Sequence, residues 1–485
     1  MKKQKLLALF FFIFVFALSY RTIEDIDLGW HLRVGQFIAE NKSVPTHDLF
    51  TFSQPNYPYI YHSWASELLL FEAFNALGLP GVSIVYAAIL TITIITIYKT
   101  SKIIAIDKIS YTSLTILTLI SYTVAGGRTR VFSLLFLSLT YYCFVKFYYL
   151  NSKIVWAAPV IILLWTNFHG SFPLGIGTLA ITSLIYYFLS GKTRRDKDKL
   201  KTLTLITVIS TLATLINPYF LNSWQNAFKI FINSYAKIAS VNPDWQSLAK
   251  NPILIVLFSA LILFSFFDKQ KVAKVHIALS ALFLLLSLLT SRFLVGLVVF
   301  AAPLANLTFL QMSRRLDKNI LNSPPVRFSI AAAVLVIALS ATANIVQAAI
   351  AYKSNDSYAQ FLSSKSKTQL YPSWSLSADN FLDINLKNAR ILNESNWGGL
   401  MLLHAPSRKI FYYSAMDNYI VNGKSFAFEY LSIANAQPGW EQKIENYQIN
   451  TIYLPPYFPL VKKLRNNNSW QTVYRDDQTV IITKN

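Results

Sequence analysis

Long hydrophobic runs separated by short polar stretches dominate the first 350 residues of the chain. There are eleven such runs, at positions 6–20, 82–98, 109–125, 131–150, 154–168, 172–190, 202–217, 252–267, 275–290, 293–311 and 328–350. A helix of about 20 apolar residues crosses the hydrocarbon core of a bilayer. Barrel strands would instead show a two-residue alternation, which these runs lack. The pattern therefore predicts an α-helical polytopic membrane protein with about 11 transmembrane helices.

The first run, 6–20, follows three lysines and has two interpretations. A signal peptide is one, with Ala17-Leu18-Ser19 as a weak cleavage site. An uncleaved first helix is favoured, because many further spans follow it. Composition agrees with a membrane protein, since 54% of the residues are hydrophobic and 14% are charged. A soluble domain carries about a quarter charged residues.

Basic residues mark one side of the predicted bundle. Residues 1–350 carry 30 Lys and Arg against 13 Asp and Glu, out of a net charge of +21 for the whole chain. With the N-terminus inside, the basic joins at 99–108, 153, 192–201, 269–274 and 314–318 all become cytoplasmic, as the positive-inside rule requires. We therefore expect a multi-pass protein of the cytoplasmic membrane with a cytoplasmic N-terminus. The excess of Lys and Arg lies in the loops between spans, where it determines the orientation of the protein in the membrane, and it implies no nucleic-acid partner.

The same topology defines an outer face and two domains. Residues 1–350 form the predicted transmembrane domain, with outer loops at 21–81 and 218–251. Residues 351–485 become polar and form a predicted extracytoplasmic α/β domain. Its expected strands are 389–392, 410–413, 451–454 and 479–483, and its expected helices are 427–436 and 439–446. The lone Cys143 lies in an apolar run, so no disulfide framework is expected.

The most informative chemistry lies in the first outer loop. Glu24-Asp25-Ile26-Asp27 follows the first span directly, and Gly29-Trp30-His31-Leu32-Arg33 comes next. Asp25 or Asp27 is the predicted general base toward an acceptor hydroxyl. An ordinary polar flank of a membrane span is the competing interpretation. The same loop holds further candidates for substrate binding, which are His31, Arg33, His62 and Glu67.

Other candidates lie at the outer ends of later spans. Arginine binds phosphate in a bidentate manner, and the phosphate of a lipid would lie at this depth. The candidates for substrate or phosphate binding are Arg128, Arg130, His169, Asp244 and Arg292. For the arginines, contact with ordinary lipid headgroups is the alternative. For His169 and Asp244, structural hydrogen bonding and helix capping are the alternatives.

No cofactor is firmly indicated. Asp25 and Asp27 offer hard oxygen ligands to a divalent cation such as Mg²⁺ or Mn²⁺, but the metal motif is incomplete. The chain contains no Walker loop, no GxSxG sequence and no zinc-type Cys/His cluster. A nucleotide-driven pump is therefore disfavoured.

Several of these motifs resemble the GT-C class of membrane glycosyltransferases. Those from the first outer loop are Asp25–Gly35, Pro45–Ser53 and His62–Glu67. Further motifs are 165–172, 216–219, 396–400 and 469–470 with 474–477. They are similar to a poorly characterised bacterial branch of the family 39, or protein mannosyltransferase-like, class. The class also includes lipid A aminoarabinose transferases and the catalytic subunits of oligosaccharyltransferases.

The resemblance implies a sugar transfer on the outer face of the membrane. It implies a polyprenyl-phosphate-linked sugar as donor, and a hydroxyl on a glycan, a lipid or a protein as acceptor. Carried over, Asp25 or Asp27 is the base or ligand near the acceptor. The arginines would neutralise the leaving phosphate of an inverting transfer. The branch often shows an Asp-rich or Arg-bearing stretch where this chain reads Tyr412 to Tyr419; the Arg is missing here, so the resemblance assigns that stretch no catalytic role.

Two other functions stay open at this point. A non-catalytic lipid-glycan carrier, or a scaffold for cell-envelope assembly, would use the same arginines to hold headgroups without turnover. A transporter is disfavoured, because charged residues are scarce in the middle of the spans.

Overall fold

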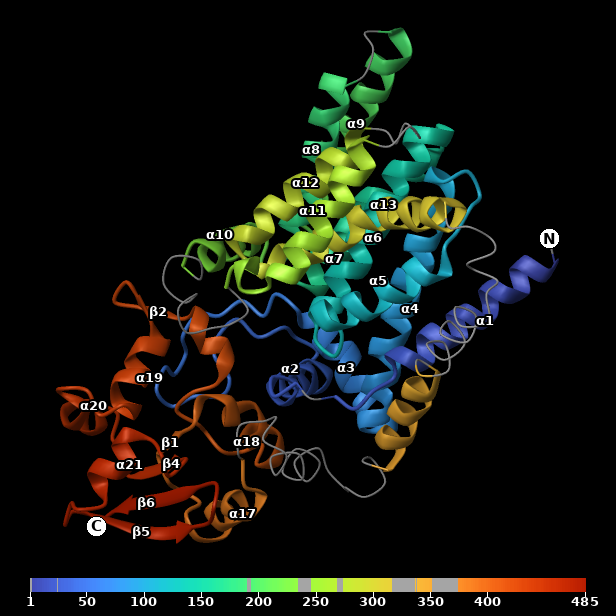
Figure 1. Ribbon diagram of the computed structural model, residues 1–485. Coiled ribbons are helices and arrows are strands. Elements are labelled where there is room, and N and C mark those ends of the chain that lie inside the picture. The colour runs from blue at the N-terminus through green and yellow to red at the C-terminus, as the bar shows by residue number, and fades with distance from the viewer. Residues whose placement is uncertain are drawn as a thin grey trace. The chain divides into compact units, whose positions relative to one another are not determined.

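The computed structural model describes residues 2–23, 25–189, 193–233, 246–267, 274–315, 336, 338–350 and 374–485. It divides into two compact units (Figure 1). Unit 1 comprises Met1–Thr22, Ser83–Lys229 and Ala239–Ala348, and unit 2 comprises Ile23–Val82, Ile230–Ile238 and Ala349–Asn485. The division at Ala348 lies close to the boundary expected at residue 350, but the first outer loop groups with the tail and not with the helices.

Unit 1 is built from helices. They are α1 (Lys2–Ser19), α4 (Leu79–Ile104), α5 (Tyr111–Ala125), α6 (Arg130–Leu150), η1 (Lys153–Ala157), α7 (Ala158–Phe168), α8 (Pro173–Leu189), α9 (Arg194–Ala213), α10 (Asn222–Asn233), η4 (Leu248–Lys250), α11 (Pro252–Phe267), α12 (Lys274–Leu289), η5 (Ser291–Phe293) and α13 (Leu294–Arg315). Helix α4 begins in unit 2 and α10 ends in it.

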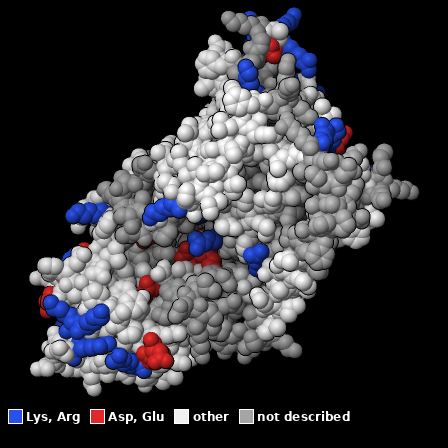
Figure 2. Space-filling view, in the orientation of Figure 1, with Lys and Arg blue, Asp and Glu red and all other residues white. Residues whose placement is uncertain are grey.

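Every expected span falls on a helix, the last one on its described part, Ala338–Ile350. Three helices of the described chain are long and apolar enough to cross a membrane, namely Leu79–Ile104, Arg130–Leu150 and Ser291–Arg314. Most of the others are shorter apolar helices. A broad face of unit 1 is free of charged side chains, whereas Lys and Arg gather near the end of the α8–α9 hairpin (Figure 2). The chain is a multi-pass membrane protein, and the number of 11 spans stays a prediction.

Polar contacts fix the directions of the helices in unit 1. The Asn306 side chain in the second half of α13 accepts from the N–H of Ser110 at 2.7 Å and donates to the carbonyl of Lys108 at 3.2 Å. Ser110 caps the start of α5, and α5 packs against α13. The two helices are therefore antiparallel, and α13 begins at the end of the bundle where α5 stops and α6 starts.

Unit 2 combines helices with a small mixed sheet. Its helices are α2 (Leu28–Asn41), α3 (Trp64–Leu77), α17 (Leu376–Asn385), η6 (Ser395–Trp397), α18 (Gly398–His404), η7 (Ser414–Asn418), α19 (Phe426–Ala434), α20 (Trp440–Asn446) and α21 (Pro459–Leu464). Its strands are β1 (Ile391–Asn393), β2 (Ile420–Val421), β3 (Lys424–Ser425), β4 (Thr451–Leu454), β5 (Trp470–Arg475) and β6 (Val480–Lys484). The main sheet has the order β1-β4-β6-β5, with β1 and β4 parallel and the other pairs antiparallel.

The tail is α/β, as expected, and one expected strand is wrong. Residues 410–413 form no strand of the main sheet. Instead Ile410 makes a single parallel bridge with Thr51 of the first loop. Backbone hydrogen bonds from Phe52 to Ile410 and from Ile410 to Phe50, both 3.1 Å long, complete this contact. The segment is apolar like a strand, but its partner lies about 360 positions away in the sequence.

Glycines allow the helices of unit 2 to touch through their backbones. A Cβ on Gly29 of α2 would lie 2.1 Å from the carbonyl oxygen of Gly399 in α18. A Cβ on Gly35 would lie 2.2 Å from the carbonyl oxygen of Glu67 in α3. No side chain larger than hydrogen fits at such separations. Helix α2 therefore packs directly against α18 in its first turn and against α3 about two turns further on.

Candidate active site

The acidic pair lies at the start of α2. Asp25 is 5% exposed, and its Oδ1 accepts the N–H of Asp27 at 3.2 Å. Asp27 is half-buried at the N-cap position, and its Oδ1 accepts from the hydroxyl of Ser414 in η7. The same hydroxyl accepts from the indole Nε1 of Trp30 at 3.1 Å. These contacts fix both carboxylates beside residues from the far end of the chain.

A buried histidine and a buried glutamate lie one turn further along. Nδ1 of His31 is 2.9 Å from Oε1 of Glu67, and the two side chains are 9% and 1% exposed. The His31 ring also stacks on Trp30, with 3.6 Å between ring centroids. Oε2 of Glu67 is buried and has no hydrogen-bond partner among the described residues. We call Asp25, Asp27, His31 and Glu67 the acidic cluster.

The environment shifts the pKa values of the buried pair. Burial lowers the pKa of His31, but the hydrogen bond and charge of Glu67, together with Asp25 and Asp27, outweigh burial and raise it. Burial also raises the pKa of Glu67, because the ionised carboxylate loses water, and His31 offsets part of this rise. Both groups therefore bind protons more tightly than they would in water.

The other two candidates of the first loop have different surroundings. The Arg33 side chain turns toward the tail, where its guanidinium donates to Gln36 of its own helix and to the carbonyl of Pro406 at 3.3 Å. His62 is half-buried in the loop that leads into α3. Neither position excludes substrate binding, and their roles stay predictions.

The segment around Asp48 is structural. Asp48 accepts the N–H groups of Phe50 and Thr51, both at 3.1 Å, and it accepts the Thr51 hydroxyl as well. Tyr413 from the tail donates to the same carboxylate at 3.4 Å. This turn therefore anchors the first loop on the tail, next to the segment that carries Ser414.

Unit 1 gathers four of the remaining candidates at one end of its helices. Arg128 and Arg130 lie where α5 gives way to α6, and Arg292 precedes the start of the antiparallel α13. Nδ1 of His169, just after α7, is 2.8 Å from Oγ of Ser133 in the first turn of α6. Arg128 is exposed, and Arg130, His169 and Arg292 are half-buried. Asp244 lies outside the described residues.

No complete metal site is visible in the described chain. Among its residues, no group of three or more His, Cys, Asp and Glu side chains is arranged to hold a metal ion. Asp25 and Asp27 supply two carboxylates, and each already has one oxygen in a hydrogen bond within the protein. The residues present therefore do not form a divalent cation site by themselves.

Sequence reasoning missed Ser414, and no signal marks it. A single serine in an aromatic stretch is unremarkable, and its contact with Asp27 depends on packing between distant segments. Glu394 was missed as well. It is 6% exposed and accepts from the backbone N–H of Asn396 at 2.8 Å, so it caps the 3-10 turn that precedes α18. This turn leads into Gly398 and Gly399, and Gly399 lies against Ile26 and Gly29 at the start of α2.

The fold is that of the GT-C glycosyltransferases, over nearly the whole chain. One similar structure is the oligosaccharyltransferase AglB from Archaeoglobus fulgidus in complex with an inhibitory peptide and a dolichol-phosphate, at 13% identity and a TM-score of 0.58. The match covers 99% of this chain and 74% of that one. No family profile matches the sequence, and no protein of curated function matches it.

A second similar structure is ArnT from Cupriavidus metallidurans in the apo state, at 13% identity and a TM-score of 0.53. The match covers 98% of this chain and 96% of that one. The two molecules are therefore alike over almost their full lengths. At this level of identity the similarity shows the fold, and function has to be argued from the site.

Proposed function

We propose that the protein is a membrane glycosyltransferase that moves a sugar from a polyprenyl-phosphate-linked donor to a hydroxyl acceptor on the outer face. The observation that carries the proposal is the acidic cluster, held rigidly within a GT-C fold that extends over the whole chain. The AglB structure was determined with a dolichol-phosphate, which agrees with a lipid-phosphate donor.

The transfer needs a group that accepts a proton from the acceptor. The acceptor oxygen would attack the anomeric carbon, the bond from that carbon to the phosphate oxygen would break, and the lipid phosphate would leave. We assign the proton to Asp27, because it is half-buried and only one of its oxygens is engaged by Ser414. Asp25 is almost fully buried and accepts from the Asp27 backbone, so it acts as a positioning residue.

His31 and Glu67 support the same turn of α2. A buried carboxylate beside a histidine carries a charge that depends on one shared proton. The charge of this pair contributes to the electrostatic potential at Asp27, and so affects how readily Asp27 accepts a proton. We propose this pair as a positioning element, and not as a group that touches the sugar.

The phosphate of the donor is assigned to the arginines of unit 1. Arg128, Arg130 and Arg292 lie at one end of that unit, and guanidinium groups match phosphate oxygens in pairs. Negative charge develops on the leaving phosphate, and fixed cations stabilise it most in the transition state. This assignment rests on chemistry and on their common end of the bundle.

The test is an assay of the purified protein in lipid nanodiscs. A mixture of polyprenyl-phosphate sugars is offered, and release of free polyprenyl phosphate is followed with and without EDTA. Release by the unmodified protein and its loss in Asp25→Ala/Asp27→Ala is the expected result. The exposed Asp477 supplies the matched control, Asp477→Asn, which leaves release unchanged.

Three other outcomes carry distinct meanings. Full release by the double variant refutes the assignment of the acidic pair. No release with any donor, from protein shown to be folded, favours the carrier or scaffold alternative. Loss of release in EDTA would require a divalent cation with ligands beyond the two carboxylates.

A further inference from the structure

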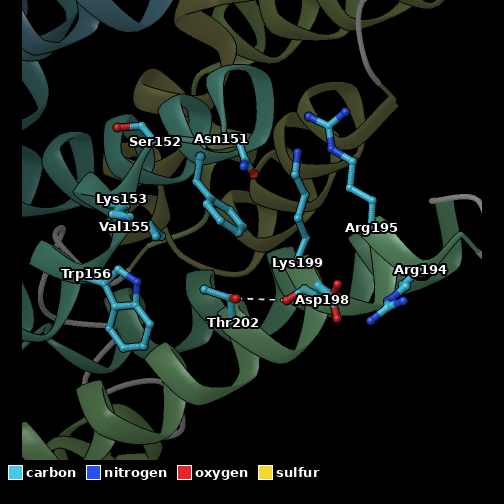
Figure 3. A pocket seen from close by; sticks show the side chains of 11 residues that line it. Asn151, Ser152, Lys153, Val155, Trp156, Arg194, Arg195, Asp198, Lys199 and Thr202 are labelled. Carbon is cyan, nitrogen blue, oxygen red and sulfur yellow. Dashed lines mark hydrogen bonds between the residues drawn. The ribbon is translucent and has the colours of Figure 1, made fainter.

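A cavity of about 610 Å³ lies in unit 1, between the end of α6, η1 and the first turns of α9 (Figure 3). Sites for small molecules commonly measure about 300 to 1,000 Å³. Four cationic side chains line it, Lys153, Arg194, Arg195 and Lys199, against the single carboxylate of Asp198. We call these four residues the basic pocket. Its balance of charge selects an anion.

The basic pocket is far from the arginines assigned to the sugar donor. Arg128 and Arg130 lie at the start of α6, and the pocket lies at its other end, beyond Leu150. A helix of 21 residues rises by about 1.5 Å per residue, so the two sites are separated by roughly the thickness of the hydrocarbon core. The pocket therefore faces the opposite membrane surface, which is the cytoplasmic one in the predicted topology.

Three of the four cations have no hydrogen-bond or ion-pair partner among the residues that the structure describes. No hydrogen bond or ion pair of the Lys153, Arg194 or Arg195 side chain occurs among the residues that the structure describes. Lys199 is anchored, because its Nζ donates to the carbonyl of Tyr148 at 2.9 Å near the C-terminus of α6. The anchored lysine fixes one wall, and the other three cations remain available to a ligand.

The arrangement along α9 concentrates positive charge on one face. Arg195 and Lys199 are four residues apart, so they share a face of the helix, and both extend from α9 in the same direction (Figure 3). The nearby Asp196 forms no ion pair with either of them in the described chain, and its carboxylate accepts from Thr193 and from the Tyr186 hydroxyl at 2.9 Å. Like charges in this spacing repel each other. An anion between them would relieve the repulsion.

The surroundings of the basic pocket are apolar. Trp156 on its lining is 45% exposed, and tryptophan is enriched at the depth of lipid headgroups. From there Val160 and Leu164 continue an exposed stripe along α7, at 58% and 45% exposure. Helix α9, which packs on α7, exposes a similar stripe at Leu205, Val208 and Leu212. A ligand for this place has an anionic head and apolar tails.

We propose that the basic pocket binds the phosphate headgroup of an anionic phospholipid, with its acyl chains along the exposed stripes of α7 and α9. Free phosphate shares the anionic chemistry of the head, but it would leave the stripes unused. Juxtamembrane Lys and Arg clusters attract anionic lipids. The proposal is independent of the sugar transfer, because it concerns the opposite end of the bundle.

The test measures lipid retention by the full-length protein. The protein is purified in a neutral detergent, mixed with phosphatidylglycerol or phosphatidylcholine, and analysed by native mass spectrometry. We expect phosphatidylglycerol to be retained at least about tenfold more than phosphatidylcholine. The variant Arg194→Gln/Arg195→Gln should lose this preference. Both side chains are exposed and unpaired within the described chain, so the fold should tolerate the change.

The matched control removes the same charge elsewhere. Lys99→Gln/Lys108→Gln changes two exposed lysines, one near the end of α4 and one in the join between α4 and α5, and it should retain phosphatidylglycerol as the unmodified protein does. Lys153→Gln is a second pocket variant and should weaken retention by a smaller factor. Unfolding midpoints without added lipid establish that each variant is folded.

Three results would overturn the proposal. One is equal retention of the two lipids by the unmodified protein. Another is equal loss of phosphatidylglycerol in the pocket variants and in the control. The third is competition by millimolar inorganic phosphate that displaces phosphatidylglycerol completely, because the pocket would then bind a free anion and not a lipid.

Discussion

The acidic cluster of unit 2 and the basic pocket of unit 1 differ in the burial and pairing of their charged side chains. In the acidic cluster Asp25, His31 and Glu67 are nearly excluded from water, and each is bonded to a neighbour. In the basic pocket Arg194 and Arg195 are exposed and have no partner within the described residues. Buried charges are costly unless they are paired. The buried and paired side chains of the acidic cluster suit a site that must keep one geometry. The exposed cations of the basic pocket suit the binding of an anion from solution.

The largest expected effect concerns the single residue Asp27. A positioned base contributes about 10² to 10⁴ in rate, so Asp27→Asn should lower the release of polyprenyl phosphate at least about 100-fold. Ser414→Ala removes a hydrogen bond to Asp27 but leaves the carboxylate, so it should cost about tenfold. Release rates in nanodiscs measure both. A larger loss for Ser414→Ala than for Asp27→Asn would contradict the assignment.

The next effect concerns how the acidic cluster is held. In Gly29→Ala the new methyl group would meet the carbonyl oxygen of Gly399 at 2.1 Å, and overpacking of this kind costs about 1 to 3 kcal/mol. Gly177 in α8 has no atom within 4 Å of an added Cβ, so Gly177→Ala is the matched control. Thermal unfolding, monitored by size-exclusion chromatography after heating, should show a lower midpoint temperature for Gly29→Ala and an unchanged one for Gly177→Ala. An unchanged midpoint would mean that α2 and α18 are not in backbone contact.

A third effect is a dependence of stability on pH. The pKa values of His31 and Glu67 are both raised in the folded protein, so the folded state binds more protons than the unfolded state. Unfolding therefore releases protons, and stability falls as the pH rises from about the unfolded pKa of Glu67 through the folded pKa of His31. The unfolding midpoint should decrease between pH 5 and pH 8.

The variant Glu67→Gln tests the source of that dependence. It removes the carboxylate that raises the pKa of His31, so the slope of the midpoint against pH should become flatter. Glu72 is exposed on the same helix, and Glu72→Gln should keep the slope of the unmodified protein. Equal slopes in all three proteins would refute the coupling between His31 and Glu67.

The smallest effect concerns the basic pocket without lipid. Arg195→Gln removes a like-charge neighbour of Lys199 on one helix face, and such pairs cost about 0.2 to 0.5 kcal/mol. In lipid-free neutral detergent this variant should therefore be slightly more stable than the unmodified protein. In phosphatidylglycerol the order should reverse. The sign change distinguishes a ligand site from a surface charge with no role.

The membrane helices could be predicted from the sequence because each signal is local. A long run of apolar residues predicts a membrane helix without knowledge of the rest of the chain, and the expected runs fall on helices where the structure describes them. The site could be predicted only in part. Asp25, Asp27 and His31 could be selected as candidates because they lie close together in the sequence. The pairing of His31 with Glu67 could not be predicted, because it joins two separate segments of the first loop.

Contacts across long sequence separations could not be predicted in this way. Residues 410–413 were expected to form a strand, but Ile410 forms only a bridge with Thr51. An apolar segment predicts a buried position without indicating which segment it pairs with. The sequence showed the residues of the basic pocket only as a topology signal, because Lys153 and Arg194 come to line one cavity through the packing of α6, η1 and α9. Charge in a join predicts the side of the membrane, but it gives no information on a cavity.

The contact between Gly29 and Gly399 has a consequence for topology. Helices that touch through their backbones lie on the same side of the membrane, so the chain crosses it an even number of times between α3 and the tail. The ten predicted spans from 82–98 to 328–350 satisfy this parity. Any revision of their number has to add or remove spans in pairs.

The same contact also implies a delay between the synthesis of α2 and the formation of its contact with α18. Helix α2 leaves the ribosome before α18, because the glycine that it packs against follows 370 residues later. At about 5 to 20 residues per second, that is a wait of roughly 20 to 70 seconds. During this time α2 has already been made and α18 does not yet exist. The acidic cluster is therefore synthesised well before the helix α18 that packs against α2.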